Sequence, residues 1–158
     1  MASVKEAAAA FLSQKRIAVT GVSRNPEGHG SNSMYQRLRQ RGYQVFAVNP
    51  NADEVDGDRC YHDLGSIPGG VDAVVIGTRP ATAEATMREC ARLGIEHVWM
   101  HRSFGARSVS EAAAGYGREQ GITVIDGGCP LMFEPVADPG HKAMRVVFTL
   151  TGQVLRQV

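Results

Sequence analysis

Apolar residues along the chain gather in five short runs, separated by longer stretches in which polar and apolar residues are mixed. Each run is rich in β-branched or aromatic side chains, a composition typical of buried strands in a parallel sheet. The predicted strands are Ile17–Thr20, Tyr43–Val48, Ala73–Ile76, Ile95–Met100 and Ile122–Ile125.

The stretches between these runs carry apolar residues at helical spacing. Glycine follows each of three such stretches, where a left-handed residue commonly ends a helix. Two serines also stand three residues before a glutamate, the spacing of a capping box. The predicted helices are Ser33–Gln40, Pro80–Leu93 and Val109–Gln120, with capping boxes Ser108/Glu111 and Ser3/Glu6, the latter opening a short helix to Leu12.

Alternation of strands and helices predicts an α/β fold: a single doubly wound Rossmann-like domain, with a five-stranded parallel sheet flanked by helices. We expect one domain over residues 1–158, with a core at about 14–135 and a C-terminal extension at 136–158. Asp138 and Pro139 favour a helix to about Leu150, although Val146–Phe148 also suits a strand. Residues 49–70 are expected to form a long connection with at most short irregular elements.

Composition narrows the classes of partner. The 17 basic and 16 acidic side chains give a net charge of +1. The chain therefore lacks the excess of positive charge that is typical of proteins that bind nucleic acid or an anionic membrane. The three cysteines are far apart, which favours reduced thiols and a cytoplasmic protein. The apolar segment Ala7–Leu12 is too short for a signal peptide or a membrane span.

In an open parallel sheet, ligands bind outside the carboxyl ends of the strands, so the residues after each strand matter most. The first strand is followed by a loop rich in glycine, serine and asparagine, from Gly21 to Ser31, which suits phosphate binding. The dinucleotide fingerprint G-x-G-x-x-G is absent. Asn49 also stands where an NAD site usually has an acidic residue, so both features weigh against ordinary NAD binding.

Arginines follow three of the strands, as Arg24, Arg79 and Arg102. They could meet a multiply phosphorylated ligand, or each could be a solvated surface residue. Cys129 after the fifth strand could act chemically, for example in a mixed disulfide with a ligand thiol, or could be a small buried hydrophobe. His29, His101 and Cys129 match no metal-ligand spacing, so we expect no metal.

Several motifs together resemble one family: Ile17–Ser23, Gly42–Pro50 with its Val48-Asn49-Pro50 end, Val98–Met100 and Cys129-Pro130. From Arg16 to Pro130 the chain is similar to small stand-alone CoA-binding proteins. It is also similar to the N-terminal CoA-binding domain of the succinyl-CoA synthetase alpha subunit. The resemblance implies that coenzyme A, or an acyl-CoA, is the ligand.

The resemblance also implies roles for individual residues. The loop after the first strand would surround the pyrophosphate through Gly21, Val22, Ser23 and Arg24, with Gly30 at the end of the same loop. After the second strand, Asn49 and Pro50 would border the adenosine, and after the third, Thr78, Arg79 and Pro80 would line the adenine and pantetheine path. The loops after the fourth and fifth strands would flank the pantetheine arm near its thiol, through His101, Arg102 and Ser103 and through Gly127, Gly128, Cys129 and Pro130.

The sequence favours a binding protein over an enzyme. It has no nucleophile elbow, and Asp126 is the lone carboxylate at the predicted strand ends. Similarity to succinyl-CoA synthetase implies that ligation needs partner domains that this chain does not include. The leading hypothesis is non-catalytic binding of CoA or acyl-CoA, as a sensor or carrier. The alternatives are an NAD(P)-binding redox or sensor module and an accessory subunit of a CoA-using enzyme, and a homodimer or an unidentified protein partner is left open.

Overall fold

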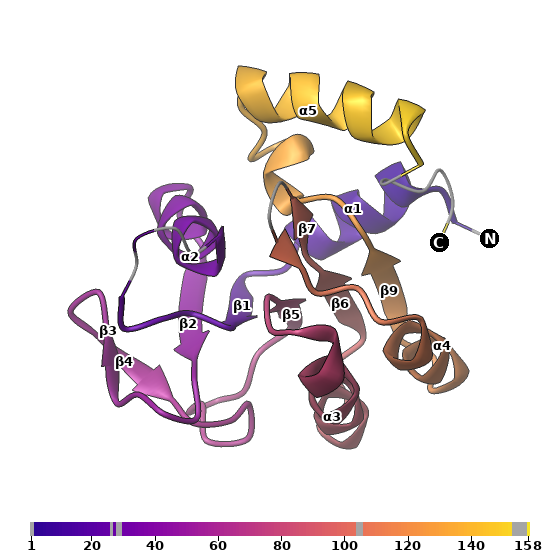
Figure 1. The fold of residues 1–158 in the computed structure, drawn as a ribbon. Helices are drawn as coiled ribbons and strands as arrows, with labels where there is room; N and C mark the ends of the chain where they lie inside the picture. Colours follow the sequence, from indigo (N-terminus) through magenta and orange to yellow (C-terminus); the bar gives the residue numbers. More distant parts are fainter. Residues whose placement is uncertain (1, 26, 28–29, 104–105, 153–157) are drawn as a thin grey trace.

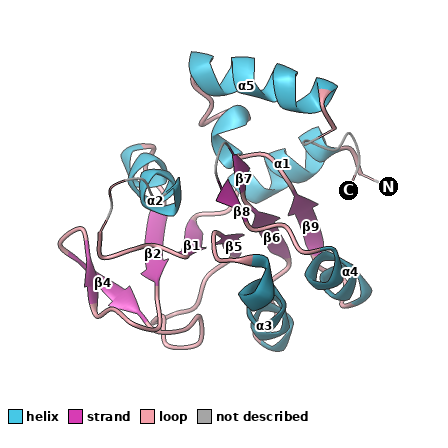
Figure 2. Cartoon of the chain, viewed as in Figure 1, coloured by secondary structure: helices cyan, strands magenta, loops and turns pink. Residues whose placement is uncertain are grey.

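A computed structural model describes residues 2–25, 27, 30–103, 106–152 and 158. Over these residues the chain forms an α/β fold, in which helices cover both faces of a central sheet (Figures 1 and 2). The sheet strands are β1 (Arg16–Thr20), β2 (Gln44–Val48), β3 (Glu54–Val55), β4 (Asp58–Tyr61), β5 (Ala73–Ile76), β6 (His97–Met100) and β9 (Thr123–Asp126).

All five predicted strands are present, but the predicted count of five is wrong because the sheet has seven strands. The two additional strands, β3 and β4, form a hairpin inside the stretch expected to be irregular. β3 runs antiparallel to β4, which pairs in parallel with β2 through Ala47–Cys60 and Val48–Tyr61. The hairpin therefore extends the sheet at one edge, visible beside β2 in Figure 1.

The helices divide between the two faces. α1 (Val4–Leu12), α2 (Gly30–Gln40) and α5 (Pro139–Leu150) contribute to one buried cluster, which includes Phe11, Leu38 and Phe148. α3 (Pro80–Arg92) and α4 (Glu111–Glu119) contribute to the cluster on the opposite face, which includes Met87 and Ala113. The strands β1, β2, β5, β6 and β9 therefore pack their alternating side chains against helices on both sides, as a doubly wound sheet requires.

Local signals placed most helix ends correctly. Ser3 and Glu6 form the predicted capping box of α1, and Asp138 caps α5 with Pro139 in its first turn, so the C-terminal segment is helical rather than a strand. The predicted cap of α4 is wrong: Ser110, not Ser108, accepts the Ala113 N–H. Ser108 is instead buried, and its N–H donates to the carbonyl of His101.

The strand order is β3-β4-β2-β1-β5-β6-β9. Counted along the chain, the six parallel strands are thus arranged 3-2-1-4-5-6, an order known from doubly wound sheets that bind dinucleotides. From β1 the chain adds β2 and β4 on one side of the sheet, and it then crosses back to add β5, β6 and β9 on the other side of β1. The order therefore reverses between β1 and β5, and the crevice expected at such a reversal lies beyond Thr20 and Ile76.

A small ribbon, β7 (Arg102–Ser103) with β8 (Ala106–Arg107), extends from the carboxyl end of β6 on the side where α2 and α5 lie (Figure 1). A short 3-10 helix, η1 (Pro130–Met132), follows β9 and leads to α5. The two chain ends lie together, because the N–H of Val158 donates to the carbonyl of Ala2.

Candidate functional site

The crevice between β1 and β5 is built on two glycines. Gly21 has φ +78°, and a Cβ atom there would lie 2.6 Å from the carbonyl carbon of Gly77. A Cβ on Gly77 would in turn lie 2.6 Å from the carbonyl oxygen of Thr20. The Thr20 hydroxyl, itself buried, accepts the Gly77 N–H at 3.1 Å. The two loops can therefore approach this closely only because neither glycine carries a side chain.

The loop after β1 is fixed by one buried asparagine. The side chain of Asn32, 2% exposed, accepts the Ser23 N–H at 2.8 Å and donates to the Ser23 carbonyl at 2.8 Å. Val22 is buried, whereas Arg24 is exposed. Asn32 was not among the predicted site residues, because a polar residue near the start of a helix gives no sign that it turns back onto the preceding loop.

Asn49, after β2, braces the same loop from the other side. Its amide Nδ2 donates to the Val22 carbonyl at 2.8 Å, and its Oδ1 accepts the Asn51 N–H at 2.8 Å. Pro50 is exposed beside it. An aspartate at this position, as in an NAD site, would lose the donor that holds Val22.

The loop after β5 presents a buried hydroxyl without a partner among the described residues and a helix start without a side-chain cap. Thr78 Oγ1 is buried and makes no hydrogen bond to any described residue. Arg79 is the N-cap of α3 and Pro80 its first residue, and no side chain caps this helix. The start of a helix carries a partial positive charge, although here the Thr82 N–H already donates to the Arg79 carbonyl at 3.0 Å. Together with the exposed Arg79, this charge makes the helix end suitable for an anionic group.

The loops after β6 and β9 are tied together. The Arg102 N–H donates to the Gly128 carbonyl at 2.8 Å, and the buried Trp99 Nε1 donates to the Gly127 carbonyl at 2.9 Å. Gly127 and Gly128 both have positive φ, and Pro130 opens the 3-10 helix in a buried position. Ser103 lies in β7, and Phe104 after it lies outside the described residues.

Two titratable groups of these loops are buried and uncharged. Burial, with the nearby His141 as a second cause, lowers the pKa of His101 to about 4. Burial raises the pKa of the Cys129 thiol to about 12. At neutral pH the site therefore presents a neutral imidazole and a neutral thiol. His29 lies outside the described residues, and no group of three His, Cys, Asp or Glu residues in the described chain could hold a metal ion.

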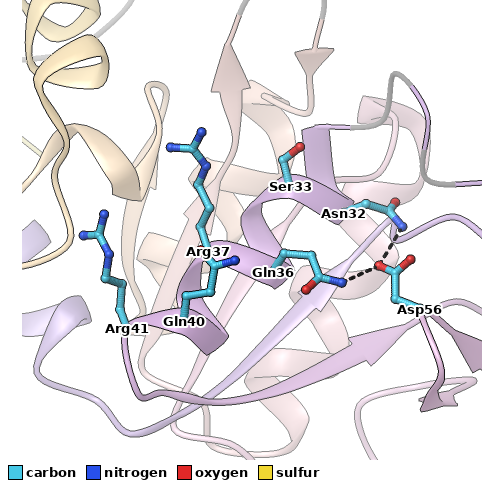
Figure 3. Close-up of a pocket in the computed structure, with 7 residues that line it drawn as sticks. All are labelled: Asn32, Ser33, Gln36, Arg37, Gln40, Arg41 and Asp56. Carbon is cyan, nitrogen blue, oxygen red and sulfur yellow. Dashed lines mark hydrogen bonds between the residues drawn. The ribbon is translucent and has the colours of Figure 1, made fainter.

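A groove of about 450 Å³ runs along α2, beside rather than over the strand ends (Figure 3). Its two arginines are engaged by the C-terminal segment: Arg37 pairs with Asp138 at 2.6 Å, and Arg41 donates to the Val136 carbonyl. Gln36 donates to the Asp56 carboxylate at 3.0 Å, as Figure 3 shows. With its arginines occupied and a carboxylate in its lining, this groove suits an anionic ligand less well than the strand ends do.

The predicted site residues follow five parallel strands, so the fold brings them to one edge of the sheet. Gly30, His101 and Cys129 also border a common hollow, joined by His141 from α5. The sequence interpretation missed three contributors: Gly77, Asn32 and His141. Of these, only Gly77, directly after a predicted strand, had a recognisable signal.

No helix in the described part of the chain is long and apolar enough to cross a membrane.

Solved structures of similar fold include a hypothetical protein from Pyrococcus horikoshii OT3, with a TM-score of 0.69 and 26% identity over 76% of this chain and 82% of that one. Another, from Thermus thermophilus, has a TM-score of 0.65 and 25% identity over 75% of this chain and 87% of that one.

Sequence relatives include acetate–CoA ligase (ADP-forming) II of Archaeoglobus fulgidus, 36% identical over 52% of this chain, and the alpha subunit of the corresponding Pyrococcus furiosus ligase, 31% identical over 56%. These matches span only 12% and 19% of the ligase chains. The uncharacterized protein YneT of Bacillus subtilis is 30% identical over 70% of this chain and 78% of its own length. The family model described as a CoA binding domain matches residues 15–135, and the chain therefore belongs to the CoA binding domain family.

Proposed function

We propose that this chain binds coenzyme A across the carboxyl edge of its Rossmann-like sheet and holds it without transforming it, as a sensor or carrier of CoA or acyl-CoA. One observation carries the proposal: at the reversal between β1 and β5, the Thr78 hydroxyl lacks a partner among the described residues and the start of α3 has no side-chain cap, beside the closely packed Gly21 and Gly77. Such groups suit the pyrophosphate of a nucleotide. The family supplies the class of nucleotide.

Within this proposal each loop has its own part of the ligand. The pyrophosphate lies between the Gly21–Arg24 loop and the uncapped start of α3, where Arg24 and Arg79 are exposed. The adenosine lies toward Pro50, since Asn49 itself is occupied with bracing Val22. The pantetheine arm crosses toward His101 and the Gly127–Pro130 loop.

The ligase relatives suggest how such a domain is used. The Archaeoglobus and Pyrococcus relatives are named acetate–CoA ligases, and one is named a subunit alpha. The matched segment is a small part of each, so ligation is not carried over to this chain. At the described strand ends His101, with its pKa lowered to about 4, is a weak base, and Cys129, with its thiol pKa raised to about 12, supplies almost no thiolate at pH 7. Binding is the role that these residues support.

The test compares thermal midpoints with CoA, acetyl-CoA, NAD, NADP and ATP at equal concentrations, because a ligand of the native state raises the midpoint by mass action. We expect CoA and acetyl-CoA to raise it. Arg24→Ala should weaken CoA about tenfold, the loss of one charge-assisted contact. Arg92→Ala is the matched control, since Arg92 is an exposed arginine at the opposite end of α3. A shift with NADP alone would favour a redox module, and no shift would reject nucleotide binding.

A protein partner is the second candidate role, favoured by three exposed apolar side chains on α5. Val146, Val147 and Leu150 are 57%, 50% and 79% exposed, while Phe148 between them is buried. We expect a second copy of this chain, or the catalytic chain of a CoA-using enzyme, to cover this surface. Sedimentation of the purified protein tests for a homodimer. A dimer that Leu150→Asp converts to a monomer would show that a second copy of this chain covers the surface. A wild-type monomer would reject the homodimer and leave the catalytic chain of a CoA-using enzyme as the partner.

A further inference from the structure

A hollow of about 210 Å³ lies at the carboxyl ends of β6 and β9, between α2 and α5. Met34, Leu131 and Cys129 give it apolar walls, and His101 and His141 add two imidazoles. Because His101 and Cys129 closely follow their strands, the hollow adjoins the end of the site to which the pantetheine arm is assigned. Its position therefore corresponds to the reactive end of the ligand rather than to its nucleotide.

His101 is the buried polar residue of the hollow, and its ring makes no hydrogen bond to a described residue. The residue is 3% exposed, and no described residue hydrogen-bonds to its ring nitrogens. Its neutral ring carries one N–H donor and one acceptor. A ligand carbonyl that accepted this N–H would form a hydrogen bond that contributes about 0.5–1.5 kcal/mol.

The charges beside the hollow offset one another. Arg37 lies 2.6 Å from the Asp138 carboxylate, and His141 Nδ1 lies 2.8 Å from the same carboxylate. The N–H of His141 donates to Asp138 as well, and these bonds lower the pKa of Asp138 and keep it ionised. The guanidinium is therefore already paired. A carboxylate on the ligand would therefore lie near the ionised Asp138, and no unpaired arginine or lysine in the described lining of the hollow would neutralise it.

We propose that this hollow receives the short, uncharged acyl group of an acyl-CoA thioester, with the His101 ring donating to the thioester carbonyl oxygen. The inference rests on the proposed CoA function and extends it to the class of thioester. A volume of about 210 Å³ is that of roughly seven liquid waters, which accommodates a chain of about two to four carbons with its carbonyl oxygen. The apolar carbons pack on Met34, Leu131 and the neutral thiol of Cys129. No covalent step is involved.

The experiment is calorimetric titration of the full chain with CoA, acetyl-CoA, butyryl-CoA and succinyl-CoA. We expect acetyl-CoA and butyryl-CoA to bind about tenfold more tightly than CoA, from one hydrogen bond and the burial of a few methyl or methylene groups. Succinyl-CoA, which carries a carboxylate, should bind no more tightly than CoA. In His101→Phe the ratio of the Kd of CoA to the Kd of acetyl-CoA should fall from about tenfold to about twofold.

The matched control is His97→Phe, because His97 begins the same strand and lies at the opposite end of the sheet. It should leave all four Kd values unchanged. Should His101→Phe fail to fold, the His101 ring signals of the wild-type protein give a second measurement: acetyl-CoA should shift them more than CoA does.

The outcomes separate the two proposals. No binding of any of the four ligands would reject the CoA function itself. Binding of CoA with equal affinity for the acyl forms, or a preference that His101→Phe leaves intact, would overturn the acyl site alone. Tighter binding of succinyl-CoA than of acetyl-CoA would overturn the assignment to uncharged acyl groups.

Discussion

Gly21 and Gly77 pack backbone against backbone at the point where the strand order reverses, so that a Cβ atom on Gly21 would lie 2.6 Å from the Gly77 carbonyl carbon. Real Cβ atoms do not approach backbone this closely. The contact joins the ends of β1 and β5, the two strands from which the halves of the sheet are wound. The same contact that closes the fold therefore also shapes the crevice.

Gly21→Ala should remove about 3–5 kcal/mol from the free energy of unfolding, because both the positive φ and the backbone clash oppose a side chain. Gly42→Ala is the matched control: Gly42 has φ +89° but nothing within 4 Å of its added Cβ. It should lose only about 1–2 kcal/mol, from the left-handed conformation alone. Urea unfolding measures both. Equal losses would show that the close approach to Gly77 has no energetic effect.

Asn32→Asp should weaken CoA binding about tenfold and lower the unfolding free energy by about 1–2 kcal/mol. The aspartate keeps an acceptor for the Ser23 N–H but loses the donor to the Ser23 carbonyl. It also places a second carboxylate near Asp56, whose Oδ2 now lies 3.5 Å from the Asn32 amide. Gln40→Ala, at the exposed C-terminal end of α2, should change neither quantity. Unchanged CoA affinity in Asn32→Asp would mean that the loop conformation does not govern binding.

His101 should make the protein less stable as the pH falls from about 6.5 to about 4. The pKa of a solvated histidine is 6.5 and that of folded His101 is about 4, so between these values the unfolded chain binds more protons. The stabilisation is complete above the unfolded value and is lost as the pH falls toward the folded one. Between pH 7 and pH 5 the loss amounts to about 2 kcal/mol.

His101→Phe should therefore remove about 2 kcal/mol from the difference in unfolding free energy between pH 7 and pH 5. Asp138, whose pKa is lowered from 3.8, loses its contribution only at more acidic pH and does not obscure the comparison. Urea unfolding at the two pH values measures the difference. A nuclear magnetic resonance titration that placed the His101 midpoint near 6.5 would contradict the burial argument.

The sequence pattern identified the elements whose signals are local. The five apolar strands and the capped helices α1 and α5 follow from short-range composition and caps. The β3–β4 hairpin was missed because its strands have two and four residues, and only Val55 and Cys60 in them are buried. Its pairing with β2 gives it strand geometry, and such pairing is not encoded in the hairpin's own periodicity.

The candidate site divides in the same way. Residues directly after the strands could be found from the strand positions alone, as Gly21, Thr78 and His101 were. Asn32 and His141 could not, because their roles depend on how α2 and α5 pack against those loops. His141 is paired with Asp138 and borders the hollow assigned to the acyl group. Long-range packing, rather than unusual composition, placed it there.

The three cysteines should be unreactive in the native protein. Cys60, Cys90 and Cys129 are 4%, 0% and 2% exposed, and burial raises the pKa of each thiol, to about 12 for Cys90 and Cys129. At pH 7 a thiol of pKa about 12 is ionised in only about one molecule in 10⁵, and the thiolate is the reactive form. Native protein treated with iodoacetamide should keep its mass, whereas protein in urea should gain three adducts.

Oxidised CoA should likewise leave the native mass unchanged. An added mass of one CoA at Cys129 would instead support the mixed disulfide that its place after β9 suggests, and would show that the hollow activates the thiol despite its burial.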